Sequence, residues 1–123
     1  MIEVQNTPKI EWRPICKLHD VPENEGVCAW VEGKQIAIYN FKAIGKWFAS
    51  ENKCPHKMQE ILSRGILGTT GENYEPKIAC PFHKKTFSLE TGKCLSGDEL
   101  SIKIYPVMIE DDFIYVGLSS DCD

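Results

Sequence analysis

The chain has 123 residues, of which 42% are hydrophobic and 26% are charged, and its net charge is −4. This length suits one domain with a modest core. No apolar run approaches the length of a membrane span, and an acidic chain is poorly suited to nucleic acid, so we expect neither a membrane nor a nucleic acid as a partner. The N-terminal residues show no basic region followed by an apolar stretch, which predicts no secretory signal and a cytoplasmic protein.

Short strands dominate the predicted secondary structure. In chain order we expect strands at 11–18, 27–31, 35–41, 45–49, 77–79, 86–89, 102–109 and 113–118, with a short turn or strand at 59–62. Glu32-Gly33-Lys34 has the composition of a hairpin turn, Pro14 marks an edge or a bulge, and 68–73 is expected to be a turn-rich surface excursion. No helical period of apolar residues is sustained along the chain. The pattern predicts an all-β fold, a barrel or sandwich of short antiparallel strands in a single domain, 1–123.

Two short motifs carry the chemistry. Cys54-Pro55-His56 and Cys80-Pro81-Phe82-His83 each place one thiol and one imidazole within a few residues, and 23 residues (57–79) separate them. Proline fixes φ and removes a backbone donor, which suits a tight loop around a bound group. Cys54, His56, Cys80 and His83 are therefore the candidate metal ligands, on a small subdomain inserted at about 52–95.

Two kinds of metal site compete for these four ligands. All four could bind one zinc ion in a structural Cys₂His₂ site, which would make the chain an interaction domain. Alternatively, the two cysteines could hold one iron, and the two histidines the other iron, of a [2Fe-2S] cluster. Zinc loops usually leave two to four residues between paired ligands. The single residue between Cys54 and His56 would cramp a chelate ring to one ion, so the spacing favours the cluster.

The two motifs together resemble the signature of the Rieske iron–sulfur proteins. The flanking sequence agrees with this resemblance over most of the chain, at 62–65, 86–87, 91–95 and 105–107. The run Leu-Ser-Arg-Gly-Ile-Leu-Gly at 62–68 and the pair Lys84-Lys85 resemble the small subunit of assimilatory NAD(P)H-dependent nitrite reductase. The second resemblance is to the Rieske ferredoxins of ring-hydroxylating dioxygenases. The resemblance implies a Rieske-like fold.

The resemblance also implies a function and partners. As a nitrite reductase subunit, the chain would transfer electrons inside an oxidoreductase of nitrate assimilation, beside a large subunit that carries flavin and sirohaem. As a dioxygenase ferredoxin, it would serve a flavoprotein reductase and an oxygenase. The sequence contains neither a dinucleotide-binding fingerprint nor a P-loop, so we expect an electron-transfer subunit without catalytic residues of its own.

The resemblance further predicts a low reduction potential. High-potential Rieske proteins carry a second cysteine pair and a Ser and Tyr that donate hydrogen bonds to sulfur. At the matching positions this chain has Gln59 and Phe82, then Lys85 and Phe87. Hydrogen bonds to cluster sulfur stabilise the reduced state, so their loss predicts a potential of about −150 to 0 mV.

The other cysteines and the charge distribution complete the expectations. We expect the four remaining cysteines to be free thiols, with Cys16 and Cys28 buried in strands. The segment 53–93 has seven basic and four acidic residues, a balance of +3 in an acidic chain. This is either ordinary solvated charge or a basic tip, with Lys57, Lys84 and Lys85, that steers the cluster toward an acidic partner.

Overall fold

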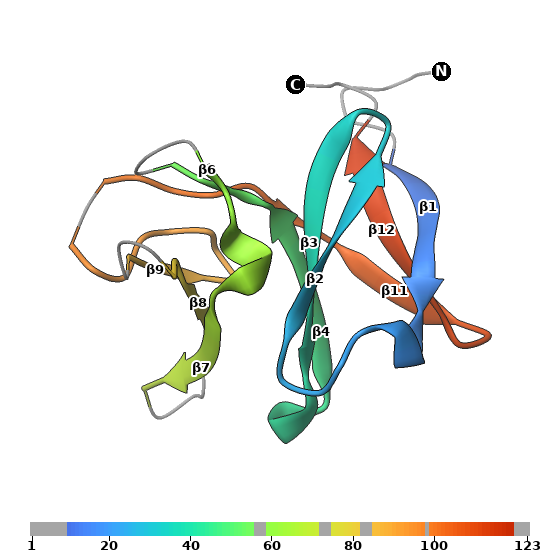
Figure 1. The fold of residues 1–123 in the computed structure, drawn as a ribbon, viewed down its shortest axis with the longest axis horizontal. Coiled ribbons are helices and arrows are strands. Elements are labelled where there is room, and N and C mark those ends of the chain that lie inside the picture. The colour runs from blue at the N-terminus through green and yellow to red at the C-terminus, as the bar shows by residue number, and fades with distance from the viewer. Residues whose placement is uncertain (1–9, 56–58, 72–74, 82–84, 98, 120–123) are drawn as a thin grey trace, which may run out of the picture.

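The computed structural model describes residues 10–55, 59–71, 75–81, 85–97 and 99–119 and is built from antiparallel strands (Figure 1). The strands are β1 (Ile10–Lys17), β2 (Gly26–Val31), β3 (Lys34–Phe41), β4 (Lys46–Glu51), β5 (Lys53–Cys54), β6 (Gln59–Glu60), β7 (Ile66–Thr70), β8 (Glu75–Ala79), β9 (Thr86–Ser88), β10 (Ile104–Tyr105), β11 (Val107–Glu110) and β12 (Phe113–Ser119). Three single-turn 3₁₀ helices are η1 (Leu18–Asp20), η2 (Lys42–Ile44) and η3 (Leu62–Arg64). The all-β prediction is confirmed. No helix in these described ranges is long and apolar enough to cross a membrane.

The central layer is a four-stranded sheet in the order β10-β4-β3-β2. Successive side chains of a strand point to opposite faces, and β3 is buried on both. Ala37 and Tyr39 pack into one apolar cluster, whereas Ile36 and Ile38 pack into a second. The central sheet therefore separates two cores.

One core lies between the central sheet and a three-stranded sheet in the order β1-β12-β11. The other core lies under two small sheets, β5-β6 and β7-β8-β9, which Figure 1 shows on the opposite side of the central sheet. Both small sheets come from the segment that holds the cysteine motifs. The molecule thus has a three-layer arrangement with the candidate site in one outer layer.

Two tight turns follow from residues with positive φ. Glu32 and Gly33, at φ 52° and 83°, join β2 to β3, and Asp111 and Asp112, at φ 54° and 69°, join β11 to β12. Two successive residues with positive φ match the twist of the strands they connect. The hairpin turn predicted at Glu32-Gly33-Lys34 is therefore confirmed. Pro14 also lies at a register shift in the edge strand β1, as its sequence position predicts.

Two predicted boundaries are wrong. The strand expected at 102–109 is broken at Pro106, where the chain leaves β10 in the central sheet and enters β11 in the outer one. Residues 68–70, expected in a surface excursion, belong to β7, which pairs with β8 from Ile66↔Ala79 to Thr70↔Glu75. In the second case cross-strand pairing overrides the local turn composition.

Candidate metal centre

The first cysteine, Cys54, lies in a short two-stranded pair formed by β5 and β6. Cys54 ends β5 and is paired with Gln59 at the start of β6, and the segment 54–59 is named the first cluster loop. Cys54 has no exposed surface. At the base of the hairpin, Lys53 is paired with Glu60, and their charged groups lie 3.9 Å apart. His56, the predicted ligand within this loop, lies outside the described residues.

The second motif has the same construction. Ala79 at the end of β8 pairs with Thr86 at the start of β9, and the backbone N–H of Cys80 donates to the carbonyl of Lys85 at 2.8 Å. These contacts close the second cluster loop, 80–85. Cys80 is 1% exposed. His83 lies outside the described residues, as His56 does, so the structure describes two of the four predicted ligands.

Both thiols belong to the same apolar core. Cys54 and Cys80 are members of one buried cluster that also contains Leu62, Ile78 and Phe87. Neither cysteine forms a disulfide. Thiolates suit soft metals and iron–sulfur clusters, and an apolar wall limits the access of water to them. The two described cysteines therefore fit a cluster held from its inner side by sulfur.

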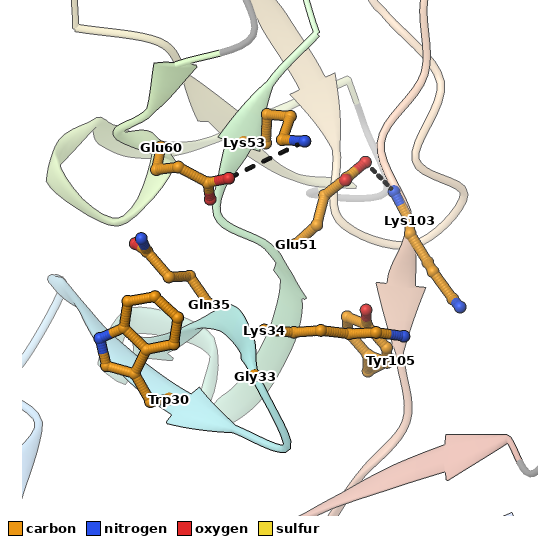
Figure 2. A pocket seen from close by; sticks show the side chains of 9 residues that line it. All are labelled: Trp30, Gly33, Lys34, Gln35, Glu51, Lys53, Glu60, Lys103 and Tyr105. Atoms are coloured by element: carbon orange, nitrogen blue, oxygen red, sulfur yellow. Dashed lines mark hydrogen bonds and ion pairs between the residues drawn. The ribbon is translucent and has the colours of Figure 1, made fainter. Parts of the chain in front are cut away.

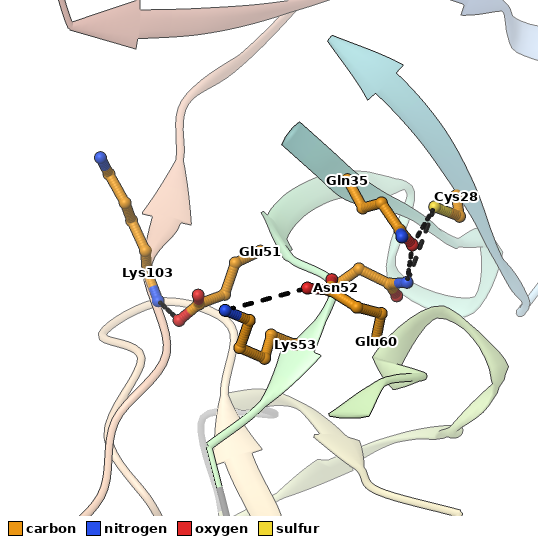
Figure 3. Close-up of polar contacts among 7 residues, drawn as sticks. All are labelled: Cys28, Gln35, Glu51, Asn52, Lys53, Glu60 and Lys103. Carbon is orange, nitrogen blue, oxygen red and sulfur yellow. Dashed lines mark hydrogen bonds and ion pairs between the residues drawn. The ribbon is translucent and has the colours of Figure 1, made fainter. Parts of the chain in front are cut away.

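The residue two positions before Cys54 holds a buried polar network that the motifs do not reveal (Figure 3). Asn52 is 2% exposed, and its side chain bridges β2, β3 and η3 through contacts with Cys28, Gln35 and Ser63. Asparagine is depleted in strands. Its occurrence between the predicted strand 45–49 and the predicted ligand Cys54 is the sequence signal that could have identified Asn52.

A pocket of about 370 Å³ opens beside the base of the first cluster loop (Figure 2). Lys53 and Glu60 from the hairpin line it together with Trp30 from β2 and Tyr105 from β10. Trp30 is 70% exposed. The Lys103 ammonium lies over the ring of Tyr105, 5.3 Å from its centroid. The pocket is thus lined both by the central sheet and by the hairpin that carries Cys54.

The remaining described cysteines are free thiols, as predicted, but their expected burial is wrong. Cys28 is exposed and Cys16 is half-buried. Cys28 lies on β2, which is the last strand of the central sheet. Partial burial, and secondarily the charge of Glu60, raises the pKa of Cys28. Partial burial, and secondarily the charge of Asp20, raises the pKa of Cys16. Both thiols are thus held in their protonated form.

The predicted basic tip is described only in part. Lys57 and Lys84 lie outside the described residues, and Lys85 lies at the end of the second cluster loop. The steering role of these three lysines stays a prediction.

Comparison with known proteins gives a consistent result across nearly the whole chain. Residues 11–117 match the family described as Rieske-like [2Fe-2S] domain. A nitrite reductase (NADH) small subunit of Salmonella typhimurium is 32% identical over 105 residues, which cover 85% of this chain and 94% of that protein. The solution structure of the Escherichia coli protein NirD is similar with a TM-score of 0.76 and 29% identity, covering 89% of this chain and 98% of that one.

Two further relatives show other settings for such a domain. The ferredoxin component of a naphthalene 1,2-dioxygenase system from Pseudomonas aeruginosa is 34% identical over 110 residues, covering 89% of this chain and 97% of that protein. A nitrite reductase [NAD(P)H] large subunit of Klebsiella oxytoca is 32% identical over 110 residues, and there the match spans 11% of the longer protein.

Proposed function

This chain belongs to the family of Rieske-like [2Fe-2S] domains, and on that premise we propose that it transfers electrons as the small subunit of an NAD(P)H-dependent nitrite reductase. The family match over 11–117, with two buried cysteines at the ends of two hairpins, is the observation that carries the proposal. It also favours a [2Fe-2S] cluster over the structural zinc site that the four ligands alone left open.

The proposed ligands are Cys54 and Cys80 for one iron and His56 and His83 for the other. A bound [2Fe-2S] cluster accepts and releases one electron at a time. The described residues would provide ligands for this cluster and exclude water from one side of it. Cys54 and Cys80 supply thiolates from inside the apolar core, and Leu62, Ile78 and Phe87 keep water from that side. We place this site on a subdomain at about 52–95 of a single domain, 1–123; the small sheets formed by β5 to β9 support that division.

The partner in this proposal is a large subunit that carries flavin and sirohaem and reduces nitrite to ammonium in the cytoplasm. Similarity to small subunits over 94% of their length supports a separate small subunit. Similarity to part of a large subunit supports the same domain acting inside that enzyme. The chain itself would provide the electron-transfer step.

A second candidate function is that of a ferredoxin for a ring-hydroxylating dioxygenase. The observation in its favour is the 34% identity to a dioxygenase ferredoxin over 97% of that protein. In this role the chain would diffuse between a flavoprotein reductase and an oxygenase.

A reconstitution experiment separates these roles. The purified chain, with its iron and sulfide measured, is mixed either with a sirohaem-containing nitrite reductase large subunit or with a dioxygenase reductase and oxygenase. We expect a complex with the large subunit in gel filtration and a gain in NAD(P)H-dependent nitrite consumption. Electron delivery to the oxygenase without a complex with the large subunit would support the ferredoxin role, and failure in both systems would refute both.

A further inference from the structure

Every polar group of Asn52, in the backbone and in the side chain, forms a hydrogen bond with another residue. Its side-chain Oδ1 accepts from the backbone N–H of Ser63 at 2.7 Å, and its Nδ2 donates to Gln35 Oε1 at 3.0 Å and to Cys28 Sγ at 3.6 Å. Its backbone N–H donates to the carbonyl of Gln35 at 3.2 Å, and its carbonyl accepts from the N–H of Leu62 at 2.9 Å. A buried amide with this many partners fixes each of them in position.

Asn52 lies just before the first cluster loop, and two of its partners, Leu62 and Ser63, lie just after it. The chain enters the loop through Asn52 and Lys53, passes Cys54, and leaves through Glu60 to Leu62. The two contacts to Leu62 and Ser63 therefore close the segment 52–63 at its base. The contacts to Gln35 attach the same base to β3 of the central sheet, which is buried from Ile36 to Phe41.

Other contacts at the base are weaker. The Lys53–Glu60 ion pair has both side chains 38% exposed, and exposed pairs contribute about 0–1 kcal/mol. The β5–β6 pairing extends over two residue pairs. Asn52 is thus a buried polar contact that connects the loop entry, the loop exit and the sheet.

We propose that Asn52 is a positioning residue for the [2Fe-2S] cluster, because it sets where the loop with Cys54 stands relative to the central sheet. The inference rests on Cys54 being a cluster ligand, as proposed above. Removing the Asn52 side chain leaves the N–H of Ser63, a residue 8% exposed, without its acceptor. An unsatisfied buried group is costly, so the loop base is expected to shift or open. A loop that moves changes how the cluster is held and how readily it is lost.

The chain offers a matched control. Asn40 is also a buried asparagine, 8% exposed, and its Nδ2 donates to the carbonyl of Val21 at 3.1 Å. It lies on β3, outside the segment 52–63. Asn40→Ala therefore removes a comparable buried amide without touching the loop base.

The experiment compares Asn52→Ala, Asn52→Asp and Asn40→Ala in the full chain carrying its cluster. The measurements are the rate of iron release to a chelator, the electron paramagnetic resonance g-values of the reduced cluster, and hydrogen exchange of the Ser63 amide. We expect Asn52→Ala to release iron about tenfold faster, to shift the g-values and to expose the Ser63 amide. We expect Asn40→Ala to leave the g-values and the Ser63 amide unchanged.

Asn52→Asp keeps an oxygen for the Ser63 N–H, so it should restore protection of that amide and part of the iron retention. It also serves as the informative variant if Asn52→Ala does not fold. Iron release and g-values in Asn52→Ala equal to those of Asn40→Ala would overturn the inference. A different result is that the iron release, g-values and Ser63 exchange follow these expectations while the unmodified chain fails to support nitrite reduction. That result would refute the proposed partner and leave the role of Asn52 standing.

Discussion

The hydroxyl groups of Tyr39 and Ser50 lie 3.0 Å apart across β3 and β4, inside the core that also buries Cys54 and Cys80. Ser50 Oγ donates to the carbonyl of Glu51 at 2.8 Å, so Tyr39 is the donor in the shared bond. Tyr39 has no exposed surface. Burial therefore raises its pKa well above the ordinary value, and the Ser50 hydroxyl, which can turn to donate to the phenolate, opposes this rise only in part.

This burial predicts a loss of stability at alkaline pH. A raised pKa means that the unfolded chain ionises first, so Tyr39 stabilises the fold fully below about pH 10 and this contribution falls as the pH rises further. The expected slope from this residue is about 1.4 kcal/mol for each pH unit above 10. Urea denaturation of the chain between pH 7 and 11 measures it.

Tyr39→Phe tests the assignment to this residue. It should cost about 1 kcal/mol at pH 7, since Ser50 keeps its bond to the Glu51 carbonyl, and should flatten the alkaline loss. Tyr115→Phe, in the half-buried tyrosine of β12, should retain that loss. The prediction would be contradicted if the free energy of unfolding fell equally above pH 10 in Tyr39→Phe and in the unmodified chain.

The proposed ligands predict which cysteines the cluster requires. Cys54→Ser and Cys80→Ser should each abolish the visible absorption of the iron–sulfur cluster, because a serine hydroxyl replaces a thiolate at a fully buried position. Cys16→Ser removes a thiol that packs against the opposite core and should keep both iron and colour. Absorption spectra with iron and sulfide analysis of the purified variants decide the matter. Retained colour in Cys54→Ser would remove that residue from the ligand set.

A glycine between the two cluster loops should resist substitution. A Cβ on Gly65 would lie 2.1 Å from the carbonyl oxygen of Ala79, the residue before Cys80. The backbone there cannot yield without moving the second loop, so Gly65→Ala should cost at least about 3 kcal/mol. Gly68→Ala is the control, since its Cβ would meet only the flexible end of Lys77 at 3.3 Å, and we expect a change within about 1 kcal/mol. Thermal unfolding compares them, and equal losses would contradict the role given to Gly65.

The parts of this molecule that could be read from sequence are those encoded locally. The hairpin turn at 32–33 and the strand at 35–41, which is β3, depend on neighbouring residues, and both were predicted. Asn52 was missed because its partners Gln35 and Ser63 are distant in sequence and meet only in the fold. The exposure of Cys28 was missed for the same reason, since the place of β2 at the sheet edge is a property of the topology.

The reduction potential is the last prediction, and it concerns the residues beside the second cluster loop. Phe87 has no exposed surface and packs in the same apolar cluster as Cys80, so its ring brings no hydroxyl donor toward sulfur. With Lys85 and Phe87 at the positions where high-potential Rieske proteins carry Ser and Tyr, we expect a potential of about −150 to 0 mV in a redox titration. A value above roughly +100 mV would be inconsistent with this reasoning.

The missing donors can be restored to test the cause. The double variant Lys85→Ser with Phe87→Tyr should raise the potential, because hydrogen bonds to sulfur stabilise the reduced state. Phe41→Tyr adds a hydroxyl to the same core at a position that packs against Phe48, with ring centroids 5.3 Å apart, and should leave the potential unchanged. An equal rise in both variants would assign the effect to core polarity in general, whereas a rise confined to the double variant assigns it to donors beside the cluster.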